Sequence, residues 1–174
     1  MKAKPIKNVA ASVRDRLLKR ASERNEDFQL VLIHYALERL LYRLSQSKHQ
    51  ERFVLKGAML FSLWTGESHR ATSDLDLLGS GDNSVKGLEA AFREICRTPV
   101  EDDGLEFAVD SIRGEEIAED QEYQGVRLAF EARLAGAKIP IQVDIGFGDA
   151  VIPNPEIVEY PHLLEFPAPR VARR

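Results

Sequence analysis

Two carboxylates stand two residues apart in a segment whose pattern predicts a β-strand. The run from Asp74 to Leu78 alternates polar and apolar residues and stops at Gly79. Because side chains two apart on a strand leave the same face, Asp74 and Asp76 would stand together while the leucines point to the core. Two carboxylates this close repel one another unless a cation lies between them, and oxygen ligands suit Mg²⁺. An acidic surface strand shows the same pattern, so this alternative stays open.

A third carboxylate lies on another alternating segment. Asp144 follows Val143 and precedes Ile145, and a neighbouring strand could bring it beside the first pair. Three carboxylates can hold two metal ions about 3.5 to 4 Å apart, one activating an attacking hydroxyl and one steadying a departing pyrophosphate. The candidate metal ligands and catalytic residues are therefore Asp74, Asp76 and Asp144.

The residues upstream of the aspartate pair suit the binding of phosphate. Lys56 and Gly57 precede a helical pattern, and a glycine lets backbone amides at a helix start approach an anion. Lys56 would add a point charge, while Arg70 and Thr72 precede the acidic strand and could neutralise or hydrogen-bond phosphate oxygens. Helix packing of Gly57 and an ion pair between Arg70 and Glu67 are the structural alternatives.

The elements that must position these residues follow an α+β order. Asn8 can cap the first of two amphipathic helices, and the second begins at Asp27. A short apolar run, either a buried strand tip or the approach to a helix, precedes a third helical stretch. One strand, one helix and three strands follow, with a hairpin at residues 135–137. We expect helices at about 8–24, 27–47, 57–66 and 84–97, an apolar run at 53–55, and strands at 74–78, 105–112, 124–134 and 138–146. This order predicts a mixed sheet with helices packed on one side.

The same patterns divide the chain into three parts. Residues 1–50 form an N-terminal helical segment that packs on the core, and residues 51–150 hold the sheet and the candidate site. Residues 151–174 carry five prolines, and we expect this tail to add no closing element to the fold.

The composition fits one domain in the cytoplasm. The chain has 174 residues, of which 44% are apolar and 30% charged, enough for one core. The lone Cys96 cannot form an internal disulfide, and the Lys-rich start runs into no apolar signal core. The most apolar stretch, residues 30–44, is interrupted by charged residues and falls short of the roughly 20 apolar residues of a membrane span. We therefore expect no membrane contact.

The charge is distributed unevenly. Residues 1–52 carry 12 Lys or Arg and 6 Asp or Glu, whereas residues 53–174 carry 12 and 22. A basic segment that precedes an acidic one permits a polyanionic partner such as nucleic acid. Solvated faces of amphipathic helices give the same pattern.

Taken together, several segments resemble the AbiEii/MenT-like family of minimal nucleotidyltransferases. The segments that carry the resemblance are Phe-Val-Leu-Lys-Gly-Ala (53–58), Arg-Ala-Thr-Ser-Asp-Leu-Asp-Leu-Leu (70–78), Val-Asp-Ile (143–145) and the helical pattern at 28–45. The resemblance implies a DNA polymerase β-like nucleotidyltransferase fold, Mg²⁺-dependent chemistry on an NTP, and a toxin role in toxin-antitoxin or phage-defence pairs. In some members the nucleotide is added to the 3′ end of tRNA.

The resemblance also implies a role for each matching residue. Asp74 and Asp76 would be the metal pair, and Asp144 the third carboxylate, which would help deprotonate the attacking hydroxyl. The triphosphate would meet residues of the two upstream segments, namely Lys56, Gly57, Arg70, Thr72 and Ser73.

The chain departs from the family pattern in two places. Ala58 stands where the family has the second glycine of Lys-Gly-Gly, which narrows backbone freedom at the helix start. Family members continue into a helical C-terminal half, whereas this chain ends at Arg174. We expect a truncated derivative, a natural short form or one part of a split protein, and exposed apolar surface that favours a homo-oligomer.

Three hypotheses of function follow. The first is a toxin-type nucleotidyltransferase that moves NMP from an NTP to a hydroxyl, on RNA and specifically the tRNA 3′ end, with a cognate antitoxin protein as a partner. The second is a catalytically silent module of the same fold that binds nucleotide or a partner protein. The third is an unrelated structural α+β domain with a fortuitous acidic pair.

Overall fold

The computed structural model describes residues 8–57, 59, 73–118, 124–147 and 156–173. Its helices are α1 (Val9–Arg24), α2 (Phe28–Gln46) and α4 (Val85–Cys96), with a short 3-10 turn, Gln50–Arg52. Its strands are β1 (Phe53–Lys56), β2 (Asp74–Gly79), β3 (Glu106–Ala118), β4 (Gln124–Leu134), β5 (Ala137–Gly146), β6 (Glu156–Glu159) and β7 (Arg170–Arg173).

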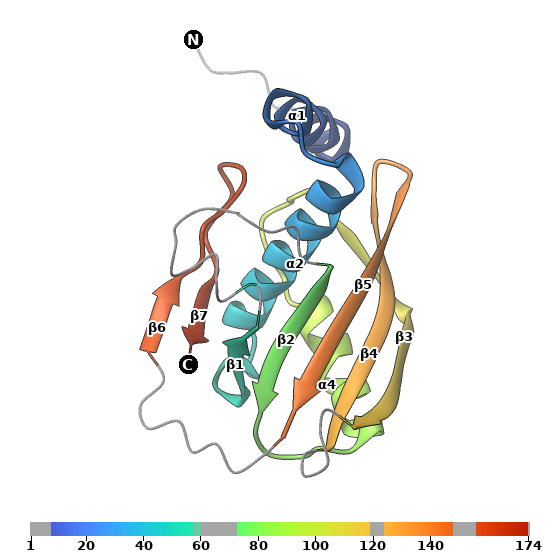
Figure 1. Ribbon diagram of the computed structural model, residues 1–174, viewed down its shortest axis with the longest axis vertical. Helices are drawn as coiled ribbons and strands as arrows, with labels where there is room; N and C mark the ends of the chain where they lie inside the picture. Colours follow the sequence, from blue (N-terminus) through green and yellow to red (C-terminus); the bar gives the residue numbers. More distant parts are fainter. Residues whose placement is uncertain (1–7, 58, 60–72, 119–123, 148–155, 174) are drawn as a thin grey trace.

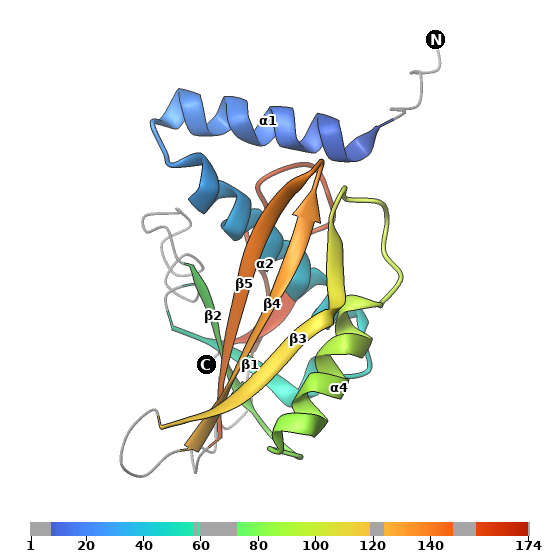
Figure 2. The same cartoon turned by 90° about the vertical axis from the view of Figure 1, so that its right-hand side faces the viewer.

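The strands form one mixed sheet in the order β3-β4-β5-β2-β1-β7-β6. The β2–β5 and β1–β7 pairs are parallel, and the other neighbours are antiparallel. Helices α2 and α4 cover one face of the sheet, and α1 crosses its end beside the β4–β5 hairpin (Figures 1 and 2). The predicted α+β class, with helices on one side and an N-terminal helical pair, is confirmed.

The three helices begin at the polar residues that the sequence indicates. The side chains of Asn8, Asp27 and Ser84 accept hydrogen bonds from the backbone N–H groups of Ala11, Leu30 and Gly87, at 3.0, 3.1 and 3.1 Å. Each bond satisfies a donor that a helix start leaves without an intrahelical partner. The predicted helices at 8–24, 27–47 and 84–97 are therefore confirmed, whereas the helix expected at 57–66 lies largely outside the described residues.

The core lies between the sheet and α2. Leu75 and Leu77 of β2 are buried, as are Val143 and Ile145, the residues paired with them on β5. The alternation therefore turns the leucines toward the helices and leaves the aspartates on the other face. Glycine at 136 and alanine at 135 both take positive φ, the geometry of a tight hairpin, so the predicted β4–β5 turn is confirmed as well.

The expectation that the C-terminal segment adds no closing element is wrong. Residues 170–173 form β7, which lies between β1 and β6, and its Val171 and Ala172 are buried. The prolines around it stand mostly in the connection before β7, where no ladder hydrogen bond is required. Strand β3 is also longer than predicted, because it continues to Ala118 past a register shift between Ala108 and Arg113.

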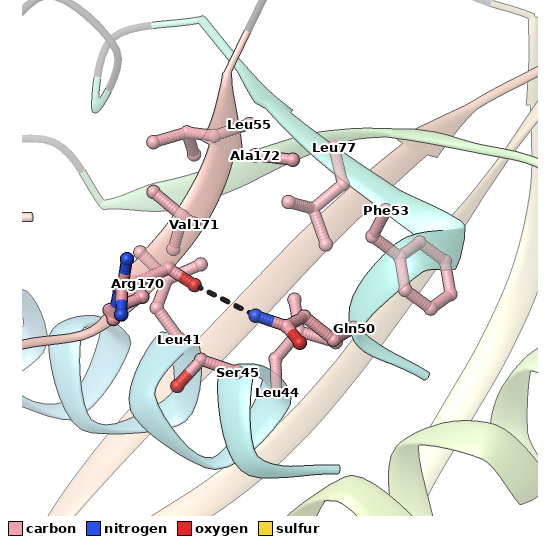
Figure 3. Close-up of a pocket in the computed structure, with 10 residues that line it drawn as sticks. All are labelled: Leu41, Leu44, Ser45, Gln50, Phe53, Leu55, Leu77, Arg170, Val171 and Ala172. Atoms are coloured by element: carbon pink, nitrogen blue, oxygen red, sulfur yellow. Dashed lines mark hydrogen bonds between the residues drawn. The ribbon is translucent and has the colours of Figure 1, made fainter. Parts of the chain in front are cut away.

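A small pocket lies where β7 packs against its neighbouring elements. It lies between α2, β1, β2 and β7, and apart from Ser45, Gln50 and Arg170 it is lined by apolar side chains (Figure 3). The Gln50 side chain donates to the Arg170 carbonyl across it, at 3.5 Å. The pocket therefore belongs to the packing of β7 and stands apart from the aspartates.

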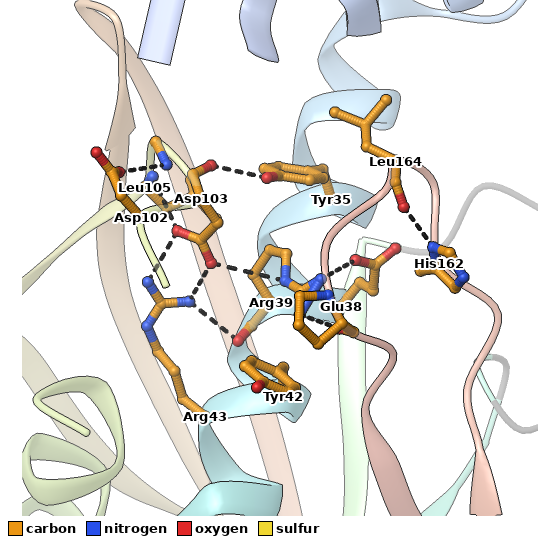
Figure 4. A network of polar contacts seen from close by, with 12 residues as sticks. Tyr35, Glu38, Arg39, Tyr42, Arg43, Asp102, Asp103, Leu105, His162 and Leu164 are labelled. Carbon is orange, nitrogen blue, oxygen red and sulfur yellow. Dashed lines mark hydrogen bonds and ion pairs between the residues drawn. The ribbon is translucent and has the colours of Figure 1, made fainter. Parts of the chain in front are cut away.

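A buried polar cluster ties α2 to the loops around it (Figure 4). Arg43 donates to both carboxylate oxygens of Asp103, at 2.8 and 3.0 Å, and Arg39 donates to the Pro167 carbonyl. Glu38 accepts from the backbone N–H of Leu163 at 2.6 Å. Burial without partners would be costly for such groups, so these contacts fix the 160–169 segment against α2.

Within the described residues, α2 and the other helices all fall short of the length and apolar character that crossing a membrane requires.

Candidate active site

A row of charged residues crosses four neighbouring strands at one level of the sheet. Lys56 on β1 is paired with Asp76 on β2, Asp76 with Asp144 on β5, and Asp144 with Arg127 on β4. Residues paired in this way project from the same face, here the face turned away from α2 and α4. The fold thus brings Asp76 and Asp144, which are far apart in the sequence, to adjacent positions.

Asp74 lies on the same face of β2, two residues before Asp76. It is half-buried, like Asp76, and its carboxylate accepts a hydrogen bond from the Ser73 hydroxyl at 3.2 Å. On β5 its pairing partner is Gln142. The structure therefore places Asp74, Asp76 and Asp144 on one face of two parallel strands, with Ser73 at the entrance to β2.

Gly57 lies directly against the Asp76 carboxylate. Its φ is +76°, in the region that favours glycine, and a Cβ at this position would lie 2.3 Å from Oδ2 of Asp76. The absence of a side chain at residue 57 therefore makes room for the carboxylate. This contact is a structural reason for the glycine that does not depend on phosphate.

Gly57→Ala tests that contact. We expect about 1 to 3 kcal/mol of lost stability from the positive φ and the clash, together with reduced activity because Asp76 is displaced. The matched control is Gly136→Ala, which has φ +82° but no atom within 4 Å of its added Cβ. Urea unfolding and activity assays on both variants should show a stability loss in each and an activity loss only at residue 57. Equal activity in the two variants would contradict the argument.

Sequence reasoning missed Arg127. Its Nε and Nη2 donate to Oδ1 and Oδ2 of Asp144, at 2.8 and 3.1 Å. These hydrogen bonds and the charge of Asp144 raise the pKa of the Arg127 guanidinium, and the charges of Asp74 and Glu115 act in the same direction. Two signals were available in the sequence, namely the alternation of β4, which turns Arg127 outward, and the predicted hairpin at residues 135–137, which sets β4 beside β5.

The carboxylate oxygens of Asp74 and Asp76 are of the kind that binds a magnesium ion. Mg²⁺ is typically held by one or two carboxylates with water and substrate phosphates, and Asp74 and Asp76 supply two carboxylates on one face. Among the residues that the structure describes, no group of three or more His, Cys, Asp or Glu side chains is gathered closely enough to hold a metal. Asp144, whose oxygens contact Arg127, is thus a neighbour of the pair in this arrangement.

Two predicted phosphate-binding residues, Arg70 and Thr72, lie outside the described residues, as does Ala58. Lys56, Gly57 and Ser73 are described, and all three lie beside or directly against the aspartates.

His34 is buried and Cys96 is partly buried. Burial, with a smaller effect from Arg20, lowers the pKa of His34 to about 4, so the imidazole is neutral at pH 7. Burial also raises the pKa of the Cys96 thiol to about 12, which keeps it protonated and unreactive.

Comparison with known proteins connects this geometry to a family. A family model described as nucleotidyl transferase AbiEii toxin, type IV toxin-antitoxin system, matches residues 39–172, a range that includes every candidate site residue. A similar solved structure is that of a protein from H. pylori described as a candidate nucleotidyltransferase, with 16% identity and a TM-score of 0.42. The match covers 81% of this chain and 52% of that chain, so this chain spans about half of its length. No curated protein matches the chain.

Proposed function

The chain belongs to the AbiEii family of nucleotidyl transferase toxins, and we propose that it transfers NMP from an NTP to an acceptor hydroxyl in a reaction that requires Mg²⁺. The observation that carries this proposal is the register of β2 and β5, which sets Asp74, Asp76 and Asp144 on one face of the sheet. Carboxylates arranged in this way suit phosphoryl chemistry because the reaction develops negative charge that a cation can balance.

Each residue of the site has a proposed role. Asp74 and Asp76 would hold Mg²⁺, which when bound supplies positive charge to the phosphates and to the attacking oxygen. Asp144 would accept the proton of the attacking hydroxyl. Lys56, whose ammonium offers three donors, lies in register with Asp76 and would contact the triphosphate.

Further phosphate contacts are proposed for the loop residues. Ser73, which already contacts Asp74, would hydrogen-bond a phosphate oxygen, and Arg70 and Thr72 precede it in the sequence. The Gly57 backbone would approach the same phosphates from the end of β1.

The proposed acceptor is RNA, in particular the 3′ end of tRNA, and the proposed partner is a cognate antitoxin protein. A toxin that modifies RNA acts in the cytoplasm, where we place this chain. Self-association into a homo-oligomer is a further proposal.

Incubation with each α-labelled NTP, Mg²⁺ and total cellular RNA tests the proposed reaction. We expect label on a discrete RNA band of a denaturing gel, lost when EDTA replaces Mg²⁺. A parallel protein gel reports transfer to a protein hydroxyl instead. No label from any of the four NTPs on either gel would refute the transferase and favour a silent module that binds nucleotide or a partner protein.

A further inference from the structure

Arg127 occupies the position between two carboxylates of neighbouring strands. On one side it holds both oxygens of Asp144 on β5, and on the other it is paired in register with Glu115 on β3. Its side chain is 39% exposed, whereas that of Asp144 is 12% exposed. The guanidinium therefore has room to move, while the carboxylate that it holds is fixed by the fold.

The contact with Asp144 has the geometry of a counter-ion. Two parallel N–H donors of one guanidinium meet the two oxygens of one carboxylate, the strongest form of this pair. Arg127 lies on the β4 side of Asp144, away from Asp76, and its donors contact both carboxylate oxygens that a divalent cation would otherwise bind. Asp74 and Glu115 also act on Arg127 through their charges, so its guanidinium interacts with carboxylates of three strands.

The guanidinium of this ion pair is open to solvent, although Asp144 is buried. Pairs that keep contact with solvent contribute little net free energy, because water and salt compensate for their loss. A divalent ion carries twice the charge of a guanidinium and attracts all the carboxylates at once. Glu115 offers Arg127 a second partner when the contact with Asp144 is given up.

We propose that Arg127 is an exchangeable counter-ion of the site, which holds Asp144 while no divalent cation is bound and moves toward Glu115 when one binds. Arg127 is then a positioning residue that acts through Asp144, and cation binding becomes a competition with its guanidinium. This inference rests on the proposed function, because it takes the aspartates as the cation site.

Mn²⁺ titration followed by the EPR signal of the free ion tests the competition without any assay of transfer. We expect Arg127→Gln to bind Mn²⁺ several-fold more tightly than the wild-type chain, because the competing charge is gone. Arg127→Lys keeps the charge but cannot hold both oxygens, so its affinity should fall between the two. A residue that merely supported Asp144 would give the opposite result, namely weaker binding in both variants.

Arg133→Gln is the matched control. Arg133 lies on the same face of β4, six residues and roughly 20 Å along the strand, well beyond the screening length at physiological salt. We expect its Mn²⁺ affinity to equal that of the wild-type chain. If Arg133→Gln tightens binding as much as Arg127→Gln does, overall charge explains the effect and the proposal is overturned.

Asp76→Asn separates this inference from the proposed function. If Mn²⁺ binding requires Asp76 but does not tighten in Arg127→Gln, the counter-ion role is wrong and the cation site stands. If Mn²⁺ binding survives Asp76→Asn, or is undetectable in both the wild-type chain and Arg127→Gln, the cation site fails and the counter-ion role fails with it. Binding that appears only in Arg127→Gln and requires Asp76 would support the competition.

Discussion

Asp76→Asn is expected to lower nucleotidyl transfer by about 10²- to 10³-fold, a loss typical of removing one preorganised electrostatic group from an active site. Asp76 lies inside the row, since it is paired with Lys56 and Asp144 and packs against Gly57. Asparagine has the same shape, so the Gly57 contact remains while the charge is lost. The effect on the rate should therefore come from charge alone.

The melting temperature distinguishes a loss of transfer caused by the missing charge from one caused by unfolding. Asp74 and Asp76 lie on one face of β2, and neutralising one of two like charges relieves their repulsion. Because Asp76 also loses its charge opposite Lys56, we expect the melting temperature of Asp76→Asn to remain close to that of the wild-type chain while transfer falls. Asp110→Asn, which removes an exposed carboxylate of β3, is the control and should transfer at the wild-type rate. Wild-type transfer by Asp76→Asn would remove Asp76 from the site.

Local patterns predicted the elements that position the aspartates. The capping residues Asn8, Asp27 and Ser84 marked three helix starts, because a short polar side chain before an apolar face satisfies free amides. The strict alternation at 74–78 placed Asp74 and Asp76 together, because side chains on a strand repeat every two residues. These parts depend on interactions within a few residues, which a sequence displays directly.

Pairing between distant segments was not predictable in the same way. The predicted hairpin at residues 135–137 sets β4 beside β5, but the parallel pairing of β5 with β2, which brings Asp144 to Asp76, joins segments far apart in the chain. Strand β7 is four residues long and follows a proline-rich stretch, so its local pattern is that of a loop. It becomes a strand through its antiparallel pairing with β6 and its parallel contact with β1.

The polar residues of α2 show a second limit of sequence reasoning. Glu38, Arg39 and Arg43 interrupt an apolar helix, and the amphipathic pattern places them opposite its apolar face. In the fold all three are buried and hold the segments that contain Asp103, Leu163 and Pro167. Their partners lie at least 60 residues away in the chain, so their role becomes visible only in three dimensions.

The titration of Glu38 makes the free energy of unfolding depend on pH, and the titration of His34 offsets this dependence. Burial raises the pKa of Glu38 to about 7, an effect that outweighs the opposing charge of Arg39 and the hydrogen bond from Leu163. His162 lowers and Asp103 raises the pKa of Glu38 by smaller amounts. His34, one turn earlier on α2, has its pKa lowered to about 4, mainly by burial and then by Arg20. Both shifts favour the neutral form of a buried side chain.

The two pKa shifts change the free energy of unfolding in opposite directions as the pH rises. Between its ordinary pKa of 4.5 and about 7, Glu38 binds a proton in the folded chain but not in the unfolded chain, so its contribution falls as the pH rises. Between about 4 and its ordinary value of 6.5, His34 binds a proton only in the unfolded chain, so its contribution rises. From pH 4.5 to 6.5 the two slopes, each at most about 1.4 kcal/mol per pH unit, oppose one another.

Replacing either residue should therefore reveal the effect of the other residue's titration on the free energy of unfolding. We expect the free energy of unfolding of Glu38→Gln to increase from pH 4.5 to 6.5 relative to the wild-type chain, because only His34 then titrates with that slope. His34→Gln should show the reverse, a decrease relative to the wild-type chain that ends near pH 6.5, the ordinary pKa of histidine. Urea unfolding followed by circular dichroism at pH 4.5, 5.5, 6.5 and 7.5 measures both, and subtracting the wild-type curve removes the groups that all chains share.

The double variant His34→Gln with Glu38→Gln is the control for this argument. It lacks both titrations, so between pH 4.5 and 6.5 its curve should run parallel to that of the wild-type chain, where the two cancel. Above pH 6.5 the curves should diverge, because only the wild-type chain still loses the Glu38 contribution. If Glu38→Gln alone ran parallel to the wild-type chain, Glu38 would be ionised beside Arg39 throughout, and the ion pair at 3.1 Å would outweigh burial.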